Sequence, residues 1–88
     1  MSAETAALLR ERLAALEPQA LAIDDESHLH AGHAGAKEGG HYKITIVAAA
    51  FAGHNMVKRH RIIHAAVGDL MRGRIHALSI RAFSPDEV

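Results

Sequence analysis

The chain of 88 residues has no cysteine and no tryptophan, and it contains one tyrosine and two phenylalanines. Without cysteine it has no disulfide framework and no thiolate to serve as nucleophile or metal ligand. Its longest apolar run, Ile44 to Ala52 with Thr45 inside it, is far shorter than a membrane span. No basic stretch leads into an apolar one at the N-terminus, so no signal or transit peptide is indicated. We therefore expect a cytoplasmic protein.

Motifs of catalysis are also missing. The sequence contains no phosphate-binding loop, no nucleophile elbow and no H-E-x-x-H zinc pair. We expect residues 1–88 to form one domain, and a domain of this size buries only about 60–65% of the surface that its unfolded chain exposes. Little room remains for a large enclosed active site, so we expect the protein to act by binding and not as an enzyme.

Charge is balanced overall but unevenly distributed. The net charge is zero, yet the segment from His54 to Arg81 carries an excess of five positive charges. Its basic residues are Lys58, Arg59, Arg61, Arg72, Arg74 and Arg81. The stretch of Lys58, Arg59, His60 and Arg61 is therefore a candidate surface for a protein partner or a nucleic acid, although an ordinary solvated face explains it equally well.

Histidine is unusually frequent, with eight residues. The spacing of His28, His30 and His33 suits metal ligation, because neutral imidazole binds zinc, copper, nickel and iron. A polar, glycine-rich loop that happens to contain histidines is the alternative. His60 and His64 are four residues apart in an expected helix, but Arg59 and Arg61 flank His60 and oppose a cation. His60 also falls on the apolar face of this expected helix, so we favour a hydrogen-bonded histidine in the core or at its boundary.

Apolar periodicity predicts two helices and three strands in the order α-β-β-α-β. The expected helices span residues 3–16 and 56–71, and the expected strands span 20–24, 41–48 and 75–83. Residues 25–40 are expected to form a long loop. The chain is thus of the α/β (α+β) class, with both helices on one face of a three-stranded mixed sheet. The second and third strands should be parallel, joined by a right-handed crossover.

Three details make this fold testable. Met56, His60, Ile63, Val67 and Leu70 should form one buried stripe on the second helix. Gly73 should end that helix. His76 should open the third strand at an end of the sheet, where a histidine with no task is as good an explanation as a functional one.

Two motifs resemble the BolA family. Residues 51–64, FAGHNMVKRHRIIH, match the pattern F-x-G-x-x-x-V-x-R-H-R, and residues 75–80, IHALSI, match its H-A-L strand. Residues 40–47, GHYKITIV, are similar to the second strand of the family. The resemblance extends over residues 5–84, which is nearly the whole chain.

The resemblance implies a KH-like (type II-like) fold and a partnership with a monothiol glutaredoxin. The two proteins would share a 2Fe–2S cluster with glutathione, and the isolated chain would not hold it. His76 corresponds to the C-terminal histidine ligand of the family. The second ligand lies between the first two strands, and His30 is the closest match by position, with His33 and His28 as alternates.

Three functions are compatible with these features of the sequence. The first is an iron–sulfur cluster-binding adaptor in cluster trafficking, cluster assembly or iron regulation. The second is a DNA-binding transcriptional regulator that uses the KH-like fold and the basic helix. The third is metal buffering by the histidine-rich loop alone. The sequence leaves open whether the chain forms a homodimer when alone.

Overall fold

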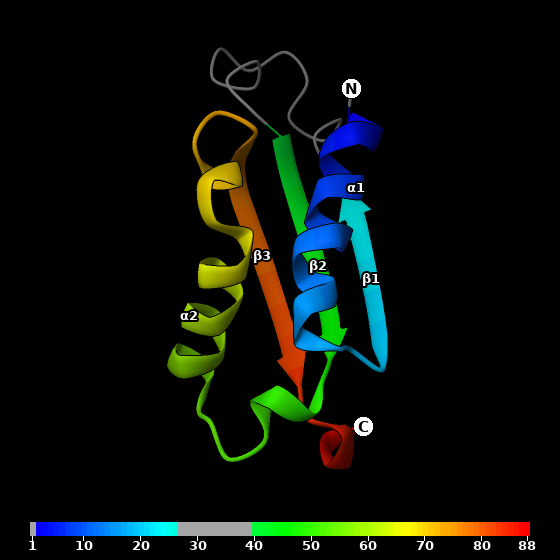
Figure 1. Ribbon diagram of the computed structural model, residues 1–88, viewed down its shortest axis with the longest axis vertical. Helices are drawn as coiled ribbons and strands as arrows, with labels where there is room; N and C mark the ends of the chain where they lie inside the picture. The colour runs from blue at the N-terminus through cyan, green and yellow to red at the C-terminus, as the bar shows by residue number, and fades with distance from the viewer. Residues whose placement is uncertain (1, 27–39) are drawn as a thin grey trace.

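The computed structural model describes residues 2–26 and 40–88, and it has the expected architecture (Figure 1). Helices α1 (Ser2–Leu13) and α2 (Met56–Val67) cover one face of a sheet built from three strands. These are β1 (Ala20–Asp25), β2 (Gly40–Val47) and β3 (Ile75–Phe83), in the spatial order β1-β2-β3. β1 pairs with β2 antiparallel, and β2 pairs with β3 parallel. The predicted α+β fold and strand order are confirmed.

Side-chain alternation along β2 determines which face of the sheet the helices cover. Tyr42, Ile44 and Ile46 are buried, whereas His41, Lys43 and Thr45 on the other face are partly exposed. From α1, Leu9 and Leu13 join this core, and from α2, Ile63 and Val67 do so. Period-two apolarity in the strand and period-3.6 apolarity in the helices therefore converge on one layer between them.

Asn55 and Gly68 set the limits of α2. The side-chain Oδ1 of Asn55 accepts a hydrogen bond from the backbone N–H of Lys58 at 2.9 Å, which is a helix N-cap. Gly68 has φ +59, in the region that favours glycine, and its N–H donates to the carbonyl of His64. The helix thus ends at Val67, before a short 3₁₀ turn, η4 (Gly68–Met71), and not at Gly73 as predicted.

Arg12 of α1 ties the two helices together at this end. Its guanidinium donates to the carbonyl of Val67 at 2.9 Å and pairs with Asp69 at 3.0 Å. The hydrogen bond from Arg12 lowers the pKa of Asp69. A carbonyl at the C-terminal end of α2 is thereby satisfied by a cation, as the helix dipole favours.

The predicted stripe on α2 is wrong at its N-terminal end. Met56 is 51% exposed, and the buried positions of the helix are Arg59, Ile63 and Val67. Leu70 in η4 continues this buried series. The buried face is therefore rotated from Met56 to Arg59, because the Arg59 guanidinium finds fixed acceptors there.

The directions of the strands determine which ends of the helices and strands lie at the same end of the molecule. β2 and β3 both begin at the end of the molecule where β1 finishes, and α2 begins at the opposite end (Figure 1). Phe83 lies seven positions after His76 in β3, which corresponds to about 23 Å of strand. Among the described residues, no helix is long and apolar enough to cross a membrane.

Candidate functional site

Two histidines from neighbouring strands meet at one end of the sheet. His41 is the second residue of β2 and His76 is the second residue of β3. Their ring centroids are 5.1 Å apart, with the ring planes inclined by 43°. His76 is exposed and His41 is partly exposed, so at least one edge of the pair faces solvent.

An irregularity in the β2–β3 ladder produces this arrangement. Gly40 pairs with Ile75 but His41 pairs with Ala77, so His76 is an extra residue on β3. A bulge of this kind bends a strand and redirects a side chain. Ile75 consequently enters the core at 2% exposure, and His76 is released to the surface instead of following Leu78 and Ile80 toward the helices.

The predicted loop ligands, His28, His30 and His33, lie outside the described residues, so their assignment stays a prediction. Within residues 2–26 and 40–88, no group of three or more potential metal ligands occurs. The possible metal ligands that come together in this part of the chain are the imidazoles of His41 and His76.

His41 is the residue that sequence reasoning missed. Spacing along the chain gives His41 no obvious partner. The sequence did predict that the second and third strands are parallel. Parallel neighbours begin at the same end of the sheet, so their first residues, His41 and His76 among them, could have been expected to lie close together.

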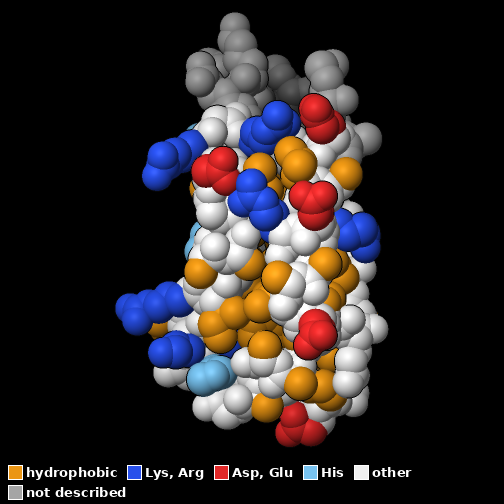
Figure 2. All heavy atoms as spheres, viewed as in Figure 1, with side chains coloured by type: hydrophobic (Ala, Val, Ile, Leu, Met, Phe, Trp, Pro, Cys, Tyr) orange, Lys and Arg blue, Asp and Glu red, His pale blue; other side chains and the backbone are white. Residues whose placement is uncertain are grey.

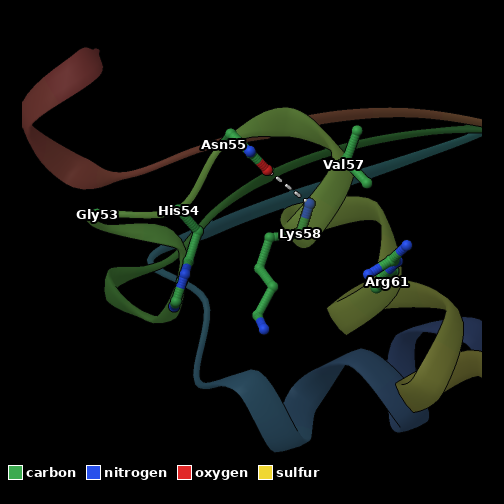
Figure 3. Close-up of a pocket in the computed structure, with 6 residues that line it drawn as sticks. All are labelled: Gly53, His54, Asn55, Val57, Lys58 and Arg61. Atoms are coloured by element: carbon green, nitrogen blue, oxygen red, sulfur yellow. Dashed lines mark hydrogen bonds between the residues drawn. The ribbon is translucent and has the colours of Figure 1, made fainter.

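A second candidate site lies at the opposite end of the molecule, where α2 begins. Gly53, with φ +79, turns the chain into the helix. A pocket of about 360 Å³ is lined by Gly53, His54, Asn55, Val57, Lys58 and Arg61. Figure 3 shows the side chains of His54 and Lys58 extending in the same direction, with Arg61 on the next turn.

The electrostatics of this pocket suit an anion. His54, Lys58 and Arg61 are all exposed, and in the described part of the chain no ion pair joins Lys58 or Arg61 to a carboxylate. In Figure 2, basic side chains project from the lower end of the molecule, on the side where α2 lies. The N-terminal end of a helix adds a partial positive charge to these two cations.

Arg59 does not share this surface, which corrects its grouping with Lys58 and Arg61. Its side chain is 8% exposed and is held by three acceptors. It donates to the carbonyls of His54 at 2.8 Å and Ala82 at 3.0 Å, and it forms a two-point contact with Glu87 at 2.6 and 3.2 Å. Arg59 therefore joins the start of α2 to the end of β3 and to the C-terminal 3₁₀ turn, η5 (Pro85–Glu87).

Glu87 is the counter-ion of Arg59. Its carboxylate also accepts a hydrogen bond from the backbone N–H of Ser84 at 2.7 Å, which completes a capping box on η5. The hydrogen bond from Arg59, followed by the one from Ser84, lowers the pKa of Glu87 from 4.5 to about 2. The positive charge of Arg59 is thus largely compensated inside the fold.

His60 occupies a boundary position, as the sequence predicted, but without the expected hydrogen bond. Its side chain is partly exposed, and its Nε2 atom is enclosed with no hydrogen-bond partner. The neighbouring His64 is exposed. Of the predicted basic stretch, Lys58 and Arg61 are therefore the residues that face solvent.

Comparisons with known proteins agree with this fold. A family model described as BolA-like protein matches residues 13–87. The solved structure of BolA1 from Arabidopsis thaliana superposes with a TM-score of 0.82 at 42% identity, covering 94% of each chain.

Two curated relatives are similar over most of this chain. The protein BOLA1, chloroplastic, of Arabidopsis thaliana is 41% identical over 87 residues, which cover 93% of this chain and 54% of the relative. A Haemophilus influenzae protein named DNA-binding transcriptional regulator BolA is 38% identical over 71 residues, covering 81% of this chain and 67% of the relative. The chain thus spans about half the length of the Arabidopsis relative.

Proposed function

The chain belongs to the family of BolA-like proteins, and on that premise we propose that it binds a 2Fe–2S cluster jointly with a monothiol glutaredoxin. In this role it is an adaptor in cluster trafficking or assembly, or in iron regulation. It contributes ligands and a docking surface, while the glutaredoxin and glutathione contribute thiolates. The activity is binding and transfer, not catalysis.

The observation that carries the proposal is the exposure of His76. A bulge that releases one imidazole from a strand, at the end of the molecule, gives a rigid donor that a second protein can reach. Imidazole is a suitable ligand for iron, including iron in 2Fe–2S centres. The donor chemistry of His76 therefore fits the group.

The proposed second ligand is His30, with His33 and His28 as alternates. All three belong to the segment between β1 and β2, and the flanking strand ends lie at the same end of the sheet as His76. Two imidazoles in place of two thiolates raise the reduction potential of such a cluster, and ligation then requires both histidines to be neutral.

Anaerobic reconstitution tests this proposal. The chain is combined with a monothiol glutaredoxin, glutathione, iron and sulfide, and the complex is followed by visible absorption and circular dichroism. We expect a stoichiometric heterodimer whose spectrum changes in His76→Ala and in His30→Ala. His64→Ala, an exposed helical histidine, is the matched control and should leave the spectrum unchanged.

The variants separate the ligand assignments. A change with His76→Ala but not with His30→Ala moves the second ligand to His28 or His33. Absence of a complex, or a spectrum indifferent to His76, contradicts the proposal.

DNA binding is the second candidate function, favoured by the basic pocket and by the name of the Haemophilus influenzae relative. Lys58 and Arg61 would contact phosphates, with no base stacking, because the chain has few aromatic residues. The double variant Lys58→Gln/Arg61→Gln should then weaken duplex binding. It should also reduce the slope of log K against log salt by about 1.8, because each phosphate contact contributes about 0.9.

A charge-matched control distinguishes a site from general attraction. Arg10→Gln/Arg72→Gln removes the same charge from exposed positions on α1 and after η4. Equal losses in both double variants would show that net charge, and not the pocket, determines binding.

A further inference from the structure

We propose that the free edge of β3 is a docking site for an extended segment of another protein, which joins the sheet as an additional, antiparallel strand. The segment carries an apolar side chain for a pocket between β3 and α2, and an acidic side chain for Arg81. The site is a property of the isolated chain and depends neither on the glutaredoxin nor on the iron–sulfur cluster. It is also distinct from the basic pocket that contains Lys58 and Arg61.

One side of β3 has no neighbouring strand. The strand order is β1-β2-β3, so within residues 2–26 and 40–88 only β2 pairs with β3. Successive residues of a strand direct their backbone N–H and C=O groups to opposite sides. The carbonyl of Phe83 accepts from the N–H of Ala48, directly after β2, at 3.0 Å. The alternate residues Ala82, Ile80 and Leu78 therefore point their backbone groups away from β2.

The fold occupies one of these outward groups and leaves others open. The carbonyl of Ala82 already accepts from the Arg59 guanidinium at 3.0 Å. In the described part of the chain, no hydrogen bond reaches the outward groups of Leu78 and Ile80. Unpaired N–H and C=O groups on an edge strand form a template for pairing with another chain. An added strand therefore gains hydrogen bonds at these two residues without displacing any bond inside the protein.

A pocket lies beside this edge, between the end of β3 and the start of α2. Its volume is about 280 Å³, and it is lined by Met56, Arg59, Glu87 and residues 80–83. Figure 1 shows α2 on the side of β3 that faces away from β2, so the helix flanks the position of an added strand. Met56 is 51% exposed, and Glu87 neutralises Arg59 at 2.6 Å. The pocket therefore suits one apolar side chain of the docked segment.

Arg81 determines the charge that the segment should carry. Its side chain is exposed, and because side chains alternate along a strand, it lies on the face opposite to Ile80 and Ala82. Its guanidinium carbon is 5.8 Å from the ring centroid of Phe83, and among the described residues no carboxylate pairs with it. The residue next to the apolar one in the docked segment falls on this face. An acidic side chain there complements Arg81.

A second copy of β3 does not have this pattern. The other residues on the Arg81 face of the strand are Ala77, Ser79 and Phe83, and none of them is acidic. Two paired β3 strands would therefore leave both Arg81 side chains without a counter-ion. In strand addition, main-chain hydrogen bonds supply affinity and alternate side chains supply specificity. A segment in which apolar and acidic residues alternate is the partner that this edge fits.

The probe is a synthetic peptide with this alternation, acetyl-Thr-Val-Glu-Leu-Glu-Val-Thr-amide, titrated into the isolated chain and followed by amide NMR shifts. We expect saturable binding with Kd below about 1 mM, and the largest shifts at Leu78, Ile80 and Ala82. Arg81→Glu should raise Kd about fivefold, and a peptide with Lys in place of Glu should bind this variant better than wild type. The control Arg10→Glu, an exposed cation on α1, should change Kd less than about twofold.

Backbone methylation of the peptide separates strand addition from general attraction. In the proposed pairing the amides of the Leu and Val residues point toward β3, whereas those of the Glu residues point away. N-methylation at Leu should therefore raise Kd by about tenfold or more. N-methylation at one Glu is the matched control and should change Kd less than about threefold.

Several results would overturn the proposal. They are the absence of saturable binding below about 1 mM, equal losses for the two methylated peptides, and largest shifts in β1 or at Lys58 and Arg61. If the free chain sediments as a dimer whose formation the peptide blocks, a second copy occupies the edge and the proposed partner is wrong. Because no glutaredoxin, iron or DNA is present, these results are independent of the reconstitution and of the duplex titration.

Discussion

Arg59 should be the residue of the basic stretch whose removal affects stability most. The change is Arg59→Met, which keeps much of the aliphatic volume and removes the guanidinium. Three acceptors lose their donor: the carbonyls of His54 and Ala82, and the carboxylate of Glu87. The bond to Ala82 is buried, so its carbonyl is left unsatisfied inside the protein.

The magnitude follows from these contacts. An unsatisfied buried acceptor costs about 1–3 kcal/mol. Glu87 is 41% exposed and is therefore solvated after the change, so the loss comes mainly from the unsatisfied carbonyl of Ala82 and should be about 2 kcal/mol. Arg59→Lys keeps the charge but cannot span three acceptors, so it should lose about half as much.

Urea denaturation followed by circular dichroism measures this directly. Native domains have about 5–15 kcal/mol of stability, so Arg59→Met should remain folded with a clearly lower midpoint. Lys58→Met is the control: it is the neighbouring exposed cation, and it should change stability by less than about 0.5 kcal/mol. Equal losses for Arg59→Met and Lys58→Met would refute the argument that Arg59 is a structural residue.

Further predictions concern the same end of the molecule and the limits of α2. The pKa of Glu87 is lowered to about 2 in the folded state, so its contribution to stability is complete above pH about 4.5 and is lost as pH falls toward 2. Glu87→Gln should therefore flatten the acid limb of unfolding free energy against pH, and an unchanged limb contradicts this. Gly68→Ala should cost about 1–3 kcal/mol, because φ is +59 and the new Cβ would lie 3.3 Å from Arg12; a thermal melt equal to wild type would show that the strain is absent. Asn55→Ala removes the N-cap of α2 and should cost about 1 kcal/mol, with Asn55→Asp restoring most of it in the same assay.

The sequence was sufficient for the fold because its signals were local and consistent. Tyr42, Ile44 and Ile46 alternate strictly with polar residues, and all three are buried. Leu9 and Leu13 likewise fall on the buried face of α1. Such periodicities depend only on the geometry of the element itself, so tertiary contacts had little to overrule.

The errors occurred where a residue's role depends on distant partners. Arg59 looked like one of several solvent-facing cations, since its three acceptors lie in segments that sequence spacing does not bring together. The predicted end of α2 was Gly73, but the helix ends five residues earlier, where Gly68 has a positive φ. The apolar residues that follow in η4 continue the helical pattern and conceal the stop.

The candidate site was predictable only in part. His76 was identified from the family motif, and its position at an exposed sheet end agrees with the structure. Its contact with His41 depends on a one-residue bulge, and nothing in the composition of β3 reveals where such a bulge occurs.

The central claim is that His76 is an iron ligand in a complex with a monothiol glutaredoxin. Pulsed EPR of the reduced complex tests it most directly, because nitrogen nuclei bound to iron give resolved ¹⁴N couplings. The account predicts couplings from two imidazoles in the wild-type complex, with one set absent in His76→Ala and both retained in His64→Ala. A wild-type complex without nitrogen couplings, or couplings unchanged in His76→Ala, would contradict it.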